Sequence, residues 1–68
     1  MQVTLCAARK NANLTQSEVG KIIGVSAKTI SGWETGKHKI KVDALIAMAA
    51  LYNAPIDDII LPISLPKS

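Results

Sequence analysis

The fold of this chain is decided by residues 14–37, which read LTQSEVGKIIGVSAKTISGWETGK. Thr15 is a favourable helix N-cap, and Glu18 three residues later completes a capping box. These two residues predict the start of a helix, and Gly24 suits the left-handed residue that commonly ends one. We therefore expect a helix over residues 16–23.

A second helix should follow after a very short turn. Ser26 can cap it, and residues 27–34 would form it. Gly36 then opens the next loop as a glycine C-cap. Two short helices joined by a tight turn that contains glycine describe a helix-turn-helix.

The same stretch resembles the Cro/C1-type (XRE-like) helix-turn-helix family, which includes small phage Cro and repressor proteins. The usual pattern of that family is L-T-Q-x-x-[LV]-[AG]-x-x-[LI]-G-[VI]-S-x-x-T-I-S-x-[WY]-E-x-G-[KR]. The matching residues are Leu14, Thr15, Gln16, Val19, Gly20, Ile23, Gly24, Val25, Ser26, Thr29, Ile30, Ser31, Trp33, Glu34, Gly36 and Lys37. The resemblance implies an all-α, five-helix domain similar to the lambda repressor domain, with helix 27–34 in the major groove of DNA.

Three further helices are expected outside the motif, over about residues 2–11, 42–52 and 56–60. Leu5 and Ala8 of the first should face the core. The core-facing residues of helix 42–52, at helical spacing, are Val42, Leu45, Met48, Ala49 and Tyr52.

The chain is expected to form one domain with a short tail. The DNA-binding domain should cover residues 1–60. Residues 61–68 contain two prolines and should form an extended C-terminal tail that takes part in a dimer interface.

Charge is distributed unevenly along the chain, whose formal net charge is +3. Residues 1–41 carry seven basic and two acidic residues, a net of +5, whereas residues 42–68 carry a net of −2. A basic half that holds the motif fits a one-sided contact with a polyanion. The alternative is a solvated surface of mixed charge.

The composition also excludes several classes of protein. One cysteine, Cys6, excludes an internal disulfide, and together with one histidine, His38, it cannot supply a usual zinc site. No apolar run approaches the ~18 residues of a membrane span, and no leader segment is evident. We therefore expect a cytoplasmic protein with no membrane contact, metal, cofactor or small-molecule substrate.

Residues at the front of helix 27–34 are the candidates for base contacts. Lys28 is the strongest candidate, because lysine donates to O6 and N7 of guanine; the alternative is a contact with phosphate alone. Ala27 can meet a thymine methyl group, and Thr29 can do the same or bind a phosphate. Gly32 offers only a close backbone approach. Direct readout is therefore sparse, and DNA shape should contribute more.

Contacts with the DNA backbone are expected around the motif helices. Gln16 begins its helix, so its side-chain amide and its backbone N–H can both face a phosphate, and the family uses the matching glutamine in this way. Two lysines and a histidine follow the second motif helix in a loop. The full expected set is Thr15, Gln16, Ser26, Ser31, Lys37, His38 and Lys39.

The resemblance also implies an internal salt bridge between Arg9 and Glu34, which would tie the first helix to the end of the second motif helix. Breaking a partly buried pair leaves an unpaired charge, so we expect this role to be structural and not catalytic. Ile30 is expected to pack in the core. Trp33 is expected to pack in the core and at its rim, and the alternative is stacking on a base.

Helix 42–52 is apolar all round, whereas a surface helix normally keeps a polar face. This composition indicates burial against a second subunit, in a two-fold homodimer. The alternative is that the tail folds back and covers the helix. The expected interface residues are Ala47, Ala50, Leu51, Ile60, Ile63 and Leu65.

The function that these features favour is a sequence-specific transcriptional regulator that occupies an operator in double-stranded DNA as a repressor. One alternative is the antitoxin of a toxin–antitoxin pair, which would cover a toxin with helix 42–52 and the tail. Another is a protein-interaction module without DNA contact, against which the basic first half argues. An enzyme is disfavoured, because the sequence shows no nucleophile–base pair and no paired carboxylates.

Overall fold

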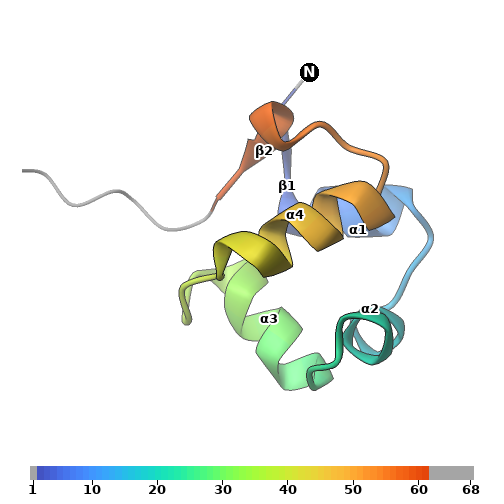
Figure 1. Cartoon of the computed structure of the whole chain (residues 1–68), viewed down its shortest axis with the longest axis vertical. Coiled ribbons are helices and arrows are strands. Elements are labelled where there is room, and N and C mark those ends of the chain that lie inside the picture. The colour runs from blue at the N-terminus through green and yellow to red at the C-terminus, as the bar shows by residue number, and fades with distance from the viewer. Residues whose placement is uncertain (1, 62–68) are drawn as a thin grey trace, which may run out of the picture.

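Four α-helices and one short strand pair make up the described part of the chain, residues 2–61, in this computed structural model. The helices α1 and α4 lie between the strand pair at one end and the α2–α3 pair at the other (Figure 1). The elements in chain order are β1 (Val3–Thr4), α1 (Leu5–Asn11), α2 (Gln16–Ile23), α3 (Ala27–Thr35), α4 (Val42–Leu51), the 3-10 helix η1 (Ile56–Asp58) and β2 (Ile59–Ile60).

The two motif helices have the caps that the sequence predicts. Thr15 Oγ1 accepts a hydrogen bond from Glu18 N at 3.1 Å, and Glu18 Oε1 accepts one from Thr15 N at 2.8 Å. This bond from the backbone lowers the pKa of the Glu18 carboxyl below its ordinary value. Gly24 ends α2 in the left-handed conformation, with φ +94°, and Ser26 Oγ caps α3 by accepting from Thr29 N.

The two helices approach each other closely at their turn. A Cβ atom on Gly20 would lie only 2.5 Å from the carbonyl oxygen of Val25. The amide of Val25 in turn donates to the carbonyl oxygen of Gly20 at 2.8 Å. A large side chain at position 20 would therefore separate α2 from α3.

The core forms where the four helices meet. Leu5, Ala8 and Ile30 are buried as predicted, and so is Trp33. Within residues 2–61, the buried cluster consists of Leu5, Ala8, Val19, Ile30, Trp33, Met48 and Tyr52.

The prediction for the start of helix 42–52 is wrong in one respect, because the side chain of Val42 is 70% exposed. Val42 is the first residue of α4, and the helix reaches the core only from Ala44 and Leu45 onwards. Met48, Ala49 and Tyr52 are buried, as expected.

The two outer helices also differ from the prediction. The first begins at Leu5 and not at residue 2, since Val3–Thr4 pair in parallel with Ile59–Ile60. The predicted helix 56–60 is a 3-10 turn followed by this strand, so five α-helices do not form. All four paired residues are β-branched, which favours strand over helix.

A buried polar cluster ties α1, α2 and α3 together. Arg9 Nε donates to Glu34 Oε2 at 2.6 Å, and Arg9 Nη2 donates to Glu34 Oε1 at 3.2 Å. Glu34 Oε1 also accepts a hydrogen bond from Gln16 Nε2 at 3.0 Å. The remaining guanidinium donors reach the carbonyl oxygen of Leu14 at 2.9 Å and the sulfur of Cys6 at 3.6 Å. We call Arg9, Glu34 and Gln16 the polar clamp.

The ion pair within the clamp is shielded from water. The side chains of Arg9 and Glu34 are only 9% and 3% exposed. The hydrogen bonds that the Arg9 guanidinium donates to Glu34 raise the pKa of this guanidinium above its ordinary value. Removal of one partner would leave the other as an unpaired buried charge, which costs about 3–5 kcal/mol.

We predict that Arg9→Met lowers the free energy of unfolding by about 3–5 kcal/mol, because it leaves the buried Glu34 carboxylate without a charged partner. Urea denaturation followed by the fluorescence of Trp33, the only tryptophan, measures this loss. The double variant Arg9→Met/Glu34→Leu should regain part of the loss, since no charge is left unpaired.

The matched control is Lys10→Met on the same helix, where the wild-type side chain is exposed. Its effect should stay within about 0.5 kcal/mol. An Arg9→Met variant as stable as this control would show that the clamp does not hold the fold together.

Candidate nucleic-acid interface

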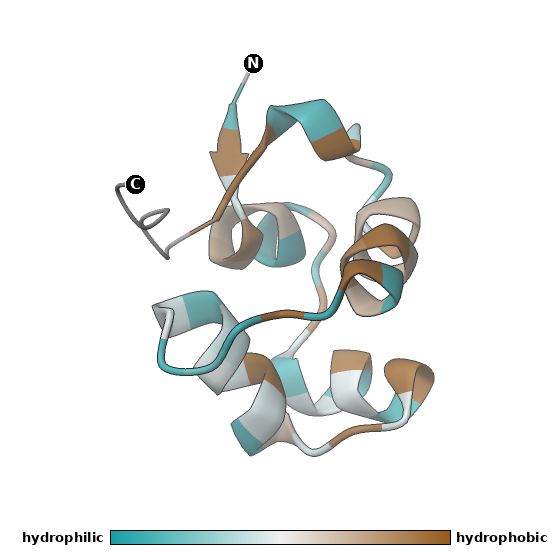
Figure 2. Cartoon of the chain, turned by 60° about the vertical axis from the view of Figure 1, so that its left-hand side comes forward, coloured by the Kyte–Doolittle hydropathy of each residue, from teal (hydrophilic) through white to brown (hydrophobic). Residues whose placement is uncertain are grey.

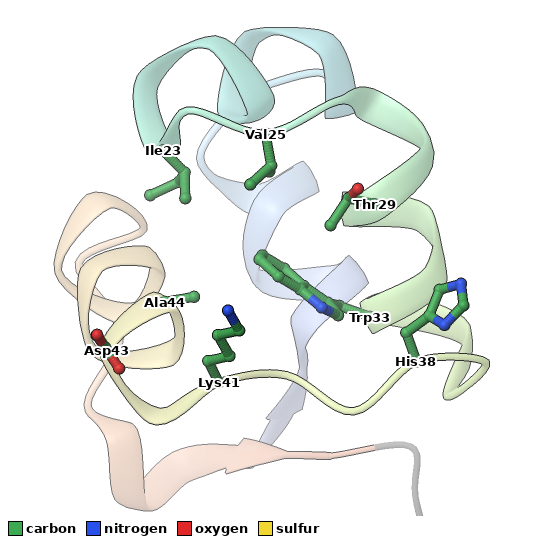
Figure 3. Close-up of a pocket in the computed structure, with 8 residues that line it drawn as sticks. All are labelled: Ile23, Val25, Thr29, Trp33, His38, Lys41, Asp43 and Ala44. Atoms are coloured by element: carbon green, nitrogen blue, oxygen red, sulfur yellow. The ribbon is translucent and has the colours of Figure 1, made fainter.

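The front of α3 presents one free charged side chain. Lys28 is exposed, and Ala27 beside it is half-buried. The Ser26 and Thr29 hydroxyls bind each other, with their oxygens 3.1 Å apart, and Ser26 also caps the helix. Thr29 points toward the pocket beside Trp33 (Figure 3). Among the predicted base contacts, Lys28 is therefore the side chain best placed to reach a base.

Gly32 does not offer the open backbone surface that the sequence suggested. It is buried, and the three atoms nearest to a Cβ atom built on it all belong to the imidazole of His38. A loop residue thus covers this position. Direct approach of the Gly32 backbone to a base does not fit this arrangement.

The start of α2 carries the donors expected to face a phosphate. Gln16 is its first residue, so the backbone N–H has no partner within the helix. Its side-chain amide gives one hydrogen to Glu34 and keeps a second available. The same hydrogen bond places this end of α2 beside the last turn of α3. The Thr15 hydroxyl, by contrast, is engaged as the cap of α2.

The loop between α3 and α4 is strongly basic. Lys37, His38 and Lys39 are exposed, as a backbone-contacting segment requires. Ser31, one turn before the end of α3, is half-buried. Lys41 is not among the expected backbone contacts, although the run KHKIK at residues 37–41 indicates a cationic segment that includes it.

A pocket of about 550 Å³ lies between this loop and the motif helices. Figure 3 shows the Lys41 side chain pointing into it, toward Trp33. Its lining residues are Ile23, Val25, Thr29, Trp33, His38, Lys41, Asp43 and Ala44. Lys41 therefore adds a cation directly beside the flank of α3.

Hydropathy differs among the elements of the domain. Apolar residues dominate α4 and the strand pair, whereas the α2–α3 end and the following loop are more polar (Figure 2). Among residues 2–61, no helix has the length and apolar character needed to cross a membrane. The same residues contain no group of His, Cys, Asp and Glu side chains able to hold a metal ion.

The helix-turn-helix family matches residues 7–59, which is most of the chain. The chain belongs to the helix-turn-helix family. An uncharacterized HTH-type transcriptional regulator from Archaeoglobus fulgidus is 33% identical over 61 residues, covering 90% of this chain and 86% of the relative. No solved structure is a significant match to the chain.

These comparisons confirm the Cro/C1-type assignment that the pattern in residues 14–37 predicts. They also agree with the interpretation of the chain as a regulator and not an enzyme.

Proposed function

We propose that this protein is a sequence-specific double-stranded DNA-binding transcriptional regulator, a repressor of the phage Cro/C1 type, which inserts α3 into the major groove of an operator. The observation that carries this proposal is the exposed Lys28 at the front of a capped α3, in the second helix of a helix-turn-helix. Occupation of the operator by the domain itself would exclude the transcription machinery.

Phosphate contacts would come from both sides of α3. On one side, the first turn of α2 offers backbone N–H groups and the amide of Gln16. On the other, Lys37, Lys39 and Lys41 are exposed in the α3–α4 loop. This arrangement would fix the register of α3 on the duplex, while base contacts supply the sequence preference.

The first test is selection of binding sites from random duplex DNA, followed by measurement of affinity against salt concentration. A consensus sequence should emerge. Lys37, Lys39 and Lys41 are the cations that would neutralise phosphates, so the logarithm of the binding constant should fall against the logarithm of the salt concentration with a slope of about −3 per subunit. Absence of an enriched sequence, together with binding that salt does not weaken, would refute the proposal.

A second test separates base contact from phosphate contact. Lys28→Ala should cost about 1–3 kcal/mol at one base pair of each half-site and relax preference there, because the bond to the base edge is lost. Lys37→Ala, the control, should weaken binding to all sequences alike. If Lys28→Ala also weakens all sequences alike, Lys28 contacts phosphate only.

We further propose that the protein acts as a two-fold dimer through α4 and β2. Ile46 is 52% exposed, and Ala47 and Ala50 on α4 and Ile60 on β2 are exposed as well. A two-fold axis through this surface would let two subunits place their α3 helices about 34 Å apart on one side of the duplex. Leu51, also expected at this interface, is partly buried against the core of its own subunit, so it would offer less surface to a second subunit. Ile63 and Leu65 lie outside the described residues.

The dimer predicts that Ile46→Glu shifts sedimentation equilibrium toward the monomer and weakens operator binding. The control is Ile22→Glu, which adds the same charge at another exposed isoleucine, 58% exposed on α2, and should leave the dimer intact. A wild-type protein that remains monomeric at high concentration, both free and on operator DNA, would rule out this interface. The apolar face of α4 would then favour the antitoxin alternative, with a toxin as its partner.

A further inference from the structure

The imidazole of His38 occupies the space that a side chain on residue 32 would take. A Cβ atom built on Gly32 would collide with His38 Cδ2, and it would lie 3.2 Å from Cγ and 3.5 Å from Nε2. Gly32 stands four residues after Lys28, so the two positions share a face of α3. The His38 ring therefore lies on the same face of α3 as Lys28, the candidate base contact.

The backbone also fixes the histidine in this position. Gly36 ends α3 with φ +83°, a left-handed conformation that turns the chain back toward the helix. The amide of His38 then donates to the carbonyl oxygen of Gly32 at 3.1 Å. His38 is thus anchored on Gly32 through both its main chain and its ring.

The ring keeps its polar atoms available. His38 is exposed, and within residues 2–61 neither ring nitrogen has a hydrogen-bond partner. A neutral imidazole offers one donor and one acceptor, and base edges in the major groove present both types of group.

We propose that His38 is a specificity-determining residue: its imidazole replaces the missing side chain of Gly32 and contacts a base edge beside the one that Lys28 contacts. This inference rests on the proposed binding of α3 in the major groove. The sequence alone predicts that His38 contacts the DNA backbone, whereas this proposal assigns it a contact with a base. It also explains how a helix with glycine at this position can discriminate between base sequences.

The test uses the selected operator and a panel of duplexes, each with one base pair changed. His38→Ala should reduce discrimination at one base pair of each half-site by about 5- to 100-fold, and that base pair should differ from the one affected by Lys28→Ala. Gly32→Ala should reduce discrimination at the same base pair, because the new methyl group displaces the ring. The double variant should lose no more than either single variant, as expected for two residues that act through one contact.

The control is Lys39→Ala, the next residue in the loop, which should weaken binding to every duplex equally. Circular dichroism verifies that each variant is folded, and if Gly32→Ala unfolds, His38→Ala alone decides. In the free wild-type protein, a nuclear Overhauser effect between His38 Hδ2 and the Gly32 α-protons should report the contact itself.

Three results would overturn the inference. The first is the absence of the Overhauser effect. The second is a His38→Ala variant that discriminates among the duplexes of the panel as well as the wild type does. The third is a His38→Ala variant that loses affinity equally for all duplexes. The last would make His38 a phosphate contact while leaving the proposed function intact. A wild-type protein with no preference at any base pair would instead refute the proposed function.

Discussion

The geometry of the whole domain depends on one carboxylate, that of Glu34. It lies near the end of α3 and accepts hydrogen bonds from Arg9 on α1 and from Gln16 at the start of α2. A buried charge of this kind is tolerated only when its bonding capacity is filled, so the three helices must keep one relative arrangement. That arrangement places the first turn of α2 beside the end of α3. The candidate phosphate donors and the candidate base contacts are therefore positioned by the same interaction.

The candidate nucleic-acid interface has few polar side chains on α3 itself. Ser26 and Thr29 are engaged with each other and with the cap, which leaves Lys28 as the free polar group at the front of α3. The loop after α3 supplies further charged side chains, because Lys37, Lys39 and Lys41 add three cations. Recognition would then depend on a small number of base contacts together with the shape and deformability of the DNA.

The sequence predicted the motif well because its signals are local. The capping box at Thr15 and Glu18 and the left-handed Gly24 each act within a few residues, and the bounds of α2 follow from them. The same is true of Ser26, which starts α3 at the expected residue. The pair of Arg9 and Glu34 is distant in sequence, and it could be anticipated only through the resemblance to a known family.

The features that the sequence did not predict are non-local. Val3–Thr4 form a strand only because Ile59–Ile60, at the other end of the domain, pair with them in parallel. Each segment alone is too short and too apolar to be distinguished from the edge of a helix. The contact of His38 with Gly32 likewise depends on how the loop folds back over α3, which the order of residues does not reveal.

The central claim is that the polar clamp holds α3 in a fixed position, ready to enter the major groove. Titration of the ¹⁵N-labelled protein with a selected operator duplex, followed by NMR, tests this claim most directly. The account predicts large shifts for the amides of Gln16, Lys28 and the loop at residues 37–39, while the Nε–H signal of Arg9 stays in place. Shifts confined to the exposed face of α4, with α3 unchanged, would contradict it.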